Sequence, residues 1–142
     1  MTLTLDTARQ LVDAVLAKAA ALDLKPIAVA VLDDRGCLRA FAAQDGTSLM
    51  RGDVARGKAF GALALGLGSR AIFERAKQQP YFIDAVNTLA HGAIVPVPGG
   101  VLIRDWDRAV IGAIGISGDS SDNDEACAVT AITEAGLHAD AG

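Results

Sequence analysis

The sequence predicts an α+β fold in which one antiparallel β-sheet packs against helices. Three observations indicate this class: an amphipathic helical pattern near the N-terminus, a hairpin of two short apolar segments directly after it, and a later block of glycine-rich strand segments between helical patterns. Strands and helices in separate blocks are typical of α+β domains rather than of alternating α/β folds. The length of 142 residues corresponds to one domain, residues 1–142.

The N-terminal third predicts a helix and a hairpin. Apolar residues recur at three-and-four spacing over Leu5–Leu22, and Thr4 is available as the N-cap. Because Lys25-Pro26 interrupts the helical pattern, the apolar run Ile27–Leu32 is predicted to be a buried strand. A turn rich in aspartate then leads to its antiparallel partner, Cys37–Ala42.

Three helices are predicted in the middle of the chain. The first follows a polar turn, can be capped by Thr47 or Ser48, and extends to about Leu67. Ser69 can cap a second helix that runs to Gln79, and further helical turns are predicted within Tyr81–Leu89.

The C-terminal third combines strands with one helix. Gly92–Ile103 is strand material interrupted by prolines, which place it at an edge or a bend of the sheet. Ala109–Gly118 is the most hydrophobic strand, and Asn123–Leu137 forms the last helix after several N-cap candidates. His138 is expected to lie in a frayed tail beyond that helix.

Two groups of glycines indicate close packing. Gly57 and Gly61 lie four residues apart on one helix face, where they allow close approach of another element or, alternatively, of a ligand. Gly112, Gly115 and Gly118 have a spacing of three, so they cannot share one face of a strand. We expect them to relieve crowding where helices cross the strand, with bulges or ligand approach as the second choice.

Composition narrows the classes of function. Hydrophobic residues make up 51% of the chain but aromatic residues only 4%, so a core of small side chains is expected, with subunit association adding buried area. The net charge of -4 argues against nucleic acid as a partner. The sequence contains neither a signal-peptide pattern nor an apolar run long enough to span a membrane. Cys37 and Cys127 are expected to be single thiols, as in a reducing compartment. These observations predict a cytoplasmic protein without membrane contact.

No stand-alone catalytic motif is present. Gly99-Gly100 matches no phosphate-binding loop, and the two histidines lie too far apart to predict a metal site. Arg51 and Lys58 lie two turns apart on one helix face, where they form a solvated surface or, alternatively, face a cleft and bind a carboxylate. Asp124 and Glu125 near the start of the last helix offer counter-charges, although the helix dipole alone accounts for acidic residues there.

Three stretches carry a family resemblance: Val29–Gly36 with Asp45-Gly46, Ala55–Ala59, and Pro98–Val101 with Ile111–Gly118. In these the chain is similar to the GlcG/HbpS family, also called the haem-degrading or DUF336 domain, which includes the C-terminal domain of PduO-type corrinoid adenosyltransferases. The resemblance implies a profilin-like antiparallel β-sheet of about five strands flanked by α-helices. It also implies assembly into dimers and often octamers, with haem binding or slow haem breakdown in some members. Arg108 departs from the family pattern, which usually has glycine in that turn.

Our first hypothesis is a small ligand-binding protein, with haem or a related tetrapyrrole as the first ligand to test. Its pocket is expected between the helix from Ser48 to Leu67, the Gly99-Gly100 bend and the end of the last strand. The expected ligand-binding residues surround that pocket: Arg51, Arg56, Lys58, Gly99, Gly100, Ser117, Gly118 and His91. His91 is expected at its edge, where solvation, a backbone hydrogen bond and haem ligation all remain open.

The alternative is a small cofactor-independent enzyme, an isomerase, tautomerase or deaminase of an organic-acid or aromatic-acid catabolic pathway. It would act on an unsaturated dicarboxylate whose carboxylates bind to Arg51, Arg56 and Lys58. Lys58, Asp124 and Glu125 are the candidate catalytic residues, and Cys127 is a further group that could move a proton. Neither hypothesis needs a metal site.

Overall fold

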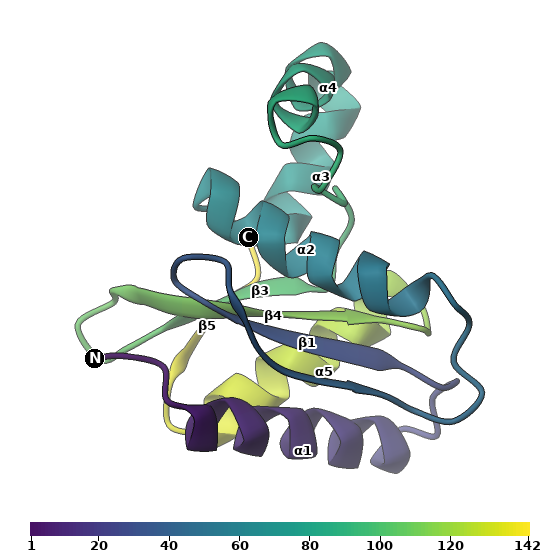
Figure 1. The fold of residues 1–142 in the computed structure, drawn as a ribbon, viewed down its shortest axis with the longest axis vertical. Helices are drawn as coiled ribbons and strands as arrows, with labels where there is room; N and C mark the ends of the chain where they lie inside the picture. The colour runs from purple at the N-terminus through teal and green to yellow at the C-terminus, as the bar shows by residue number, and fades with distance from the viewer.

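A computed structural model describes all residues from 1 to 142 and contains a five-stranded antiparallel sheet with helices on both faces (Figure 1). The strand order is β2-β1-β4-β3-β5. In chain order the elements are α1 (Leu5–Ala21), β1 (Ala28–Asp33), β2 (Leu38–Ala43), α2 (Arg51–Leu65), α3 (Ser69–Gln78), α4 (Pro80–Leu89), β3 (Gly100–Arg104), β4 (Val110–Ser117), α5 (Ser121–Glu134) and β5 (His138–Asp140). The predicted α+β fold with one antiparallel sheet is confirmed.

The two faces of the sheet are packed differently. The larger core lies between the sheet and the pair α1 and α5, and consists mainly of valine, leucine and isoleucine side chains. On the opposite face α2 packs through alanines such as Ala55, Ala59 and Ala62, which are fully buried. Small side chains let α2 lie very close to the sheet, and a Cβ on Gly115 of β4 would collide with the Ala55 carbonyl. The predicted role of that glycine in relieving crowding under a helix is therefore confirmed.

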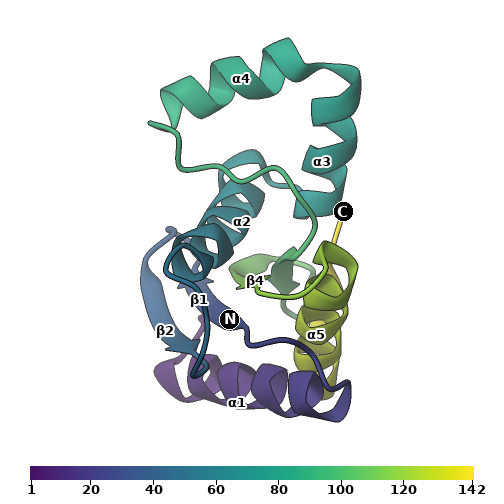
Figure 2. The ribbon, with the colours of Figure 1, turned by 90° about the vertical axis from the view of Figure 1, so that its right-hand side faces the viewer.

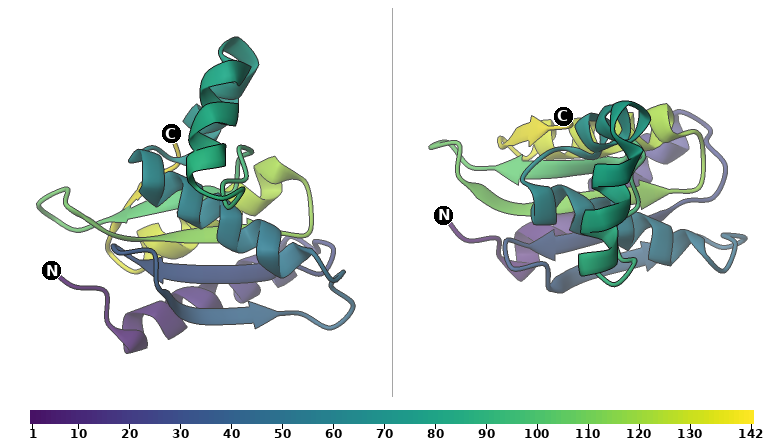
Figure 3. Two further views of the ribbon diagram at one scale, coloured as in Figure 1. Left: turned by 45° about the horizontal axis from the view of Figure 1, so that its top comes forward. Right: turned by 90° about the horizontal axis from the view of Figure 1, so that it is seen from above.

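Helices α3 and α4 form an arm that stands away from the sheet beyond α2 (Figures 2 and 3). The chain returns from the arm along the outer surface of α2, where the Val95 N–H donates to the Gly57 carbonyl over 3.2 Å. A Cβ on Gly57 would lie 2.5 Å from Val95 Cγ2, and one on Gly61 would lie 2.9 Å from Ile94 Cγ2. The predicted packing role of both glycines is confirmed, and the packing partner is this returning segment.

Local capping explains where several elements begin. Thr4 caps α1 as predicted, since its Oγ1 accepts from the Thr7 N–H over 3.1 Å. Thr47 and Ser48 do not cap α2, whose N-cap is Met50, because the Thr47 hydroxyl donates to the Gln44 carbonyl instead. Ser69 lies inside the first turn of α3, and its Oγ accepts from the Gly100 N–H over 2.7 Å. Both of these capping predictions were wrong: the Thr47 hydroxyl donates to the Gln44 and Ile27 carbonyls, and the Ser69 hydroxyl accepts from Gly100 of β3.

Two predictions for the C-terminal third also need correction, one on a strand and one on the end of the last helix. Of the predicted strand material only Gly100–Arg104 is a strand. Residues 93–99 are not part of a strand, although the Gly99 carbonyl accepts from the Ile116 N–H of β4 over 3.1 Å. Helix α5 ends at Glu134 rather than at Leu137, and His138 begins β5 instead of lying in a frayed tail. Strand β5 pairs with β3, and Asp140 accepts from Arg104 over 2.9 Å.

No helix of the protein combines the length and the apolar character needed to cross a bilayer.

Candidate functional site

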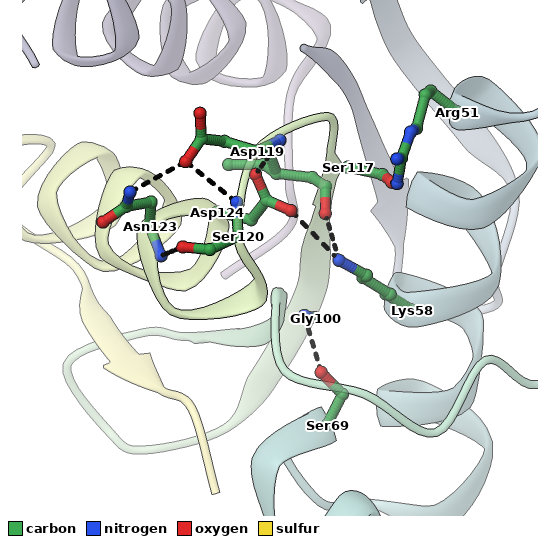
Figure 4. Close-up of polar contacts among 10 residues, drawn as sticks. Arg51, Lys58, Ser69, Gly100, Ser117, Asp119, Ser120, Asn123 and Asp124 are labelled. Carbon is green, nitrogen blue, oxygen red and sulfur yellow. Dashed lines mark hydrogen bonds and ion pairs between the residues drawn. The ribbon is translucent and has the colours of Figure 1, made fainter. Parts of the chain in front are cut away.

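Lys58 of α2 and Asp124 of α5 form a buried ion pair at the end of β4 (Figure 4). The Lys58 Nζ donates to Asp124 Oδ2 over 3.3 Å and to the Ile116 carbonyl over 2.8 Å. The Asp124 carboxylate also accepts from the Asp119 N–H over 3.2 Å. The residue exposure is 2% for Lys58 and 1% for Asp124, so neither charge reaches water.

Burial shifts both members of this pair toward their neutral forms. Loss of water lowers the pKa of the Lys58 ammonium below its usual value, and the charge of Asp124 opposes that shift. Loss of water likewise raises the pKa of the Asp124 carboxyl, and Lys58 opposes it. The pair therefore joins the helices on opposite faces of the sheet through a desolvated contact whose partners depend on each other.

The glycines of the predicted bend accommodate the Lys58 side chain. A Cβ on Gly99 would lie 2.9 Å from Lys58 Nζ and 2.9 Å from the Ile116 carbonyl oxygen. A Cβ on Gly100 would collide with the Lys58 backbone carbonyl. The room that these glycines leave is therefore occupied by the Lys58 side chain and by backbone carbonyl groups of Lys58 and Ile116.

The other predicted residues near the bend also contact protein groups. Arg51 Nη1 donates to Ser117 Oγ over 3.1 Å, and Ser117 is fully buried. Gly118 packs against the Pro26 carbonyl. Glu125 accepts from Arg70 of α3 over 2.9 Å, so it pairs with a different cation than its neighbour Asp124. Cys127 is buried one turn further along α5, and burial raises the pKa of its thiol.

A cleft of about 490 Å³ lies on the other side of α2, between this helix, the β1–β2 turn and the segment that returns from the arm. Its charged residues are Asp53 and Arg56, and neither side chain forms an ion pair within the chain. The remaining lining is mostly apolar or glycine: Gly36, Met50, Val54, Gly57, Phe60, Gly92, Ala93 and Val95. Of the predicted binding residues only Arg56 lies here, and the sequence reasoning missed Met50, Phe60 and Val95. The one signal that pointed to this face of α2 was the pair Gly57 and Gly61.

His91 lines a second cavity of about 440 Å³ beside the cleft, together with Asp84, Asn87, Thr88 and Gly92. Gly92 borders both cavities. His91 and Gly92 have φ angles of 56° and 77°, so two successive residues at the end of α4 adopt the left-handed conformation. No group of three histidine, cysteine, aspartate or glutamate side chains is arranged to hold a metal ion.

Comparison with known structures shows the same fold in several proteins. The crystal structure of a PduOC–haem complex matches with a TM-score of 0.86 and 25% identity, covering 96% of this chain and 97% of the other. Klebsiella pneumoniae protein ORFY matches with a TM-score of 0.83 and 27% identity, covering 94% and 90%. A double mutant of Streptomyces reticuli HbpS, at 24% identity and a TM-score of 0.80 with 94% and 87% covered, shares the fold.

Family comparison gives the assignment. No curated protein sequence matches the chain. The family model described as haem degrading protein HbpS-like matches residues 3–133. That range begins before α1 and ends one residue before the end of α5, so it includes four strands of the sheet, four complete helices and nearly all of α5. The chain therefore belongs to the HbpS-like family of haem-degrading proteins.

Proposed function

We propose that this protein binds haem in the cleft along α2. The observation that carries the proposal is the combination of about 490 Å³ of space, apolar walls and an arginine without an internal partner. Ligand sites of this kind are mostly apolar with a few polar groups that fix orientation. The family description and the haem complex of PduOC support the choice of haem as the ligand.

The residues of the cleft fit the chemistry of haem. Phe60, Val54 and Val95 offer apolar contact for a flat macrocycle. The guanidinium of Arg56 would bind a propionate carboxylate, for which a planar two-donor group is well suited. Asp53 lies on the same wall, so the second propionate would extend into water. Bound haem supplies redox-active iron, and the chain contributes the walls and the charge that orient it.

The dicarboxylate-enzyme hypothesis is not supported by a comparable observation. In that hypothesis Lys58 binds a substrate carboxylate and Asp124, Glu125 or Cys127 moves a proton, whereas Lys58 and Asp124 are buried against each other. The Glu125 carboxylate pairs with Arg70, and Cys127 is buried.

Haem titration tests the proposal. Hemin added to the purified protein should shift the Soret band with saturation, and haem breakdown would appear as a slow loss of that absorbance. Arg56→Glu places a carboxylate where the propionate binds and should weaken binding by roughly tenfold or more. Arg9→Glu on the exposed surface of α1 makes the same change of charge and should bind like the unaltered protein. Absence of a saturable Soret shift contradicts haem binding, and equal affinities of the two variants contradict the cleft as the site.

Self-association from dimer to octamer, which the family resemblance implies, belongs to the same proposal. The low aromatic content favours it, because small side chains bury little area within one subunit. Sedimentation velocity with and without hemin measures the assembly state, and a monomer at all concentrations would contradict it.

A further inference from the structure

We infer that a cavity beside β5 binds a phosphate group, at a site separate from the proposed haem cleft. The cavity has a volume of about 550 Å³ and shares no lining residue with the cleft along α2. It lies at the edge of the sheet that β5 forms, next to the turn between β3 and β4. Seven residues line it: Arg104, Arg108, His138, Ala139, Asp140, Ala141 and Gly142.

Two of the three basic side chains in this lining have no partner within the chain. Arg104 Nε and Nη2 each lie 2.9 Å from Asp140 Oδ2, so these two charges balance each other. Arg108 and His138 form hydrogen bonds only through their backbones. Neither pairs with a carboxylate, and the carboxylate at Gly142 forms no ion pair. The guanidinium of Arg108 and the imidazole of His138 therefore have hydrogen-bond donors available for a ligand.

The backbone conformation at Arg108 supports a role for its side chain. Arg108 has a φ of 66° in the turn between β3 and β4, a conformation that favours glycine because a residue with a Cβ atom is strained there. The guanidinium offers no compensation inside the chain, since it contacts no hydrogen-bond partner. Strain of this kind is often retained at binding sites, so the strained backbone and the unpartnered side chain point to the same function.

The turn that carries Arg108 is held in place from two directions. Arg104 Nη1 donates to the Arg108 carbonyl over 3.0 Å. Trp106 Nε1 donates to the Gly136 carbonyl over 3.1 Å, which fixes the turn to the connection that precedes β5. His138 lies opposite Arg104 in the pairing of β3 with β5. The backbones of Arg108 and His138 are thus fixed relative to each other before a ligand binds, which reduces the entropy lost on binding.

A phosphate group fits these donors better than a carboxylate does. A guanidinium presents two parallel N–H groups that match a pair of phosphate oxygens, and an imidazole adds a donor that carries a positive charge when protonated. A carboxylate has only two oxygens, and one arginine fork already uses both. The phosphate group has a further oxygen for His138. The volume of about 550 Å³ lies in the range of small-molecule sites, so the phosphate of a larger molecule can also enter.

The test is a nuclear magnetic resonance titration with inorganic phosphate at fixed pH and ionic strength. The chain contains two histidines, so both imidazole ring signals can be followed and assigned with the variant His138→Gln. We expect the His138 signal to shift with saturation, while the His91 signal, from the other cavity, stays in place. A second titration with phenyl phosphate shows whether the site takes free phosphate or a phosphate ester, according to which binds more tightly.

Arg108→Asn tests the residue on which the proposal depends. Asparagine accepts the left-handed backbone, so the variant should melt no lower than the unaltered protein without phosphate, yet bind phosphate roughly tenfold more weakly or worse. A loss of binding in a protein of equal or higher stability cannot be attributed to misfolding. Arg9→Asn on the exposed surface of α1 removes the same charge elsewhere and should bind phosphate like the unaltered protein.

Three results would overturn the proposal. The first is a His138 signal that does not saturate with either phosphate compound, and the second is equal phosphate affinity of Arg108→Asn and the unaltered protein. The third is an equal loss of affinity in Arg9→Asn, because net charge alone would then account for the binding. None of these results depends on whether the cleft binds haem.

Discussion

Replacing Lys58 by methionine tests whether the buried ion pair holds α2 to α5. Methionine retains most of the length and volume of the lysine stem but removes the ammonium that faces Asp124 over 3.3 Å. The Asp124 side chain, 1% exposed, is then left with only the Asp119 N–H as a donor. An uncompensated buried carboxylate must be protonated or the structure around it must open, and both processes lower the free energy of unfolding.

The expected loss is large for one substitution. Removing one partner of a buried pair costs about 3–5 kcal/mol, which is a substantial part of the 5–15 kcal/mol that stabilises a typical domain. For a chain of this size the melting temperature should fall by about 6–20 °C. Asp124→Asn should also be destabilising, because it leaves the Lys58 charge buried. The double variant with both substitutions should lose less than the sum of the single ones, with a coupling of about 2–3 kcal/mol.

Urea unfolding followed by circular dichroism measures the free energy of unfolding of each variant. The values are comparable when the variants share the same dependence of that free energy on urea concentration. The control is Lys77→Met, since Lys77 pairs with Glu74 at the surface, where the two side chains are 54% and 51% exposed. That change should cost about 0.2–1 kcal/mol. If Lys58→Met costs no more than this control, or if the double variant is as unstable as the sum of the single ones, the ion pair does not hold the two helices together.

Three further substitutions test other features of the structure. Gly100→Ala should lower the free energy of unfolding by about 1–3 kcal/mol, because the added Cβ meets the Lys58 carbonyl. The control is Gly136→Ala, which has open space around it and only an unfavourable φ of 78°, and it should lower that free energy by about 1 kcal/mol. Urea unfolding measures both variants. Arg108→Gly should raise the melting temperature by about 2–4 °C, because Arg108 has a φ of 66° and glycine removes roughly 1 kcal/mol of backbone strain. Calorimetry measures the melting temperature, and an unchanged or lower value would refute this prediction. Asp119 has its pKa lowered from 3.8 to about 2, chiefly by the Asn123 side chain, so it stabilises the fold above pH 4 and this contribution disappears as the pH falls to 2. The difference in melting temperature between the unaltered protein and Asp119→Asn should therefore shrink from pH 6 to pH 2, and a difference that stays constant would contradict it.

Periodicity and turn chemistry were sufficient to predict most of the fold. The spacing of apolar residues in α1, its Thr4 cap and the apolar run of β1 are local signals that the structure confirms. Strand β5 could not be found this way, because its three residues are polar or small and pair through their backbone with β3, about 35 residues away. The returning segment 93–99 looked like a strand because its apolar residues pack on α2, and packing on a helix produces the same composition.

The site was predicted less well than the fold. Lys58, Asp124, Ser117 and the glycine bend were correctly expected to lie near one another, but small residues next to a cation do not reveal whether a ligand or the lysine stem fills the space. The cleft depends on how the arm returns over α2, a long-range arrangement that the pattern of neighbouring residues does not encode.

The two sides of α2 contact different surroundings: one side packs on the sheet, and the other lines the cleft. One side is anchored by Ala55, Lys58 and Ala59, which fix both the rotation of the helix and its position along the sheet. The opposite side presents Asp53, Arg56 and Phe60 to the cleft. Substitutions on the second side would change the walls of the proposed haem site while α2 keeps its place, so the ligand preference of that site could change without any change in the core.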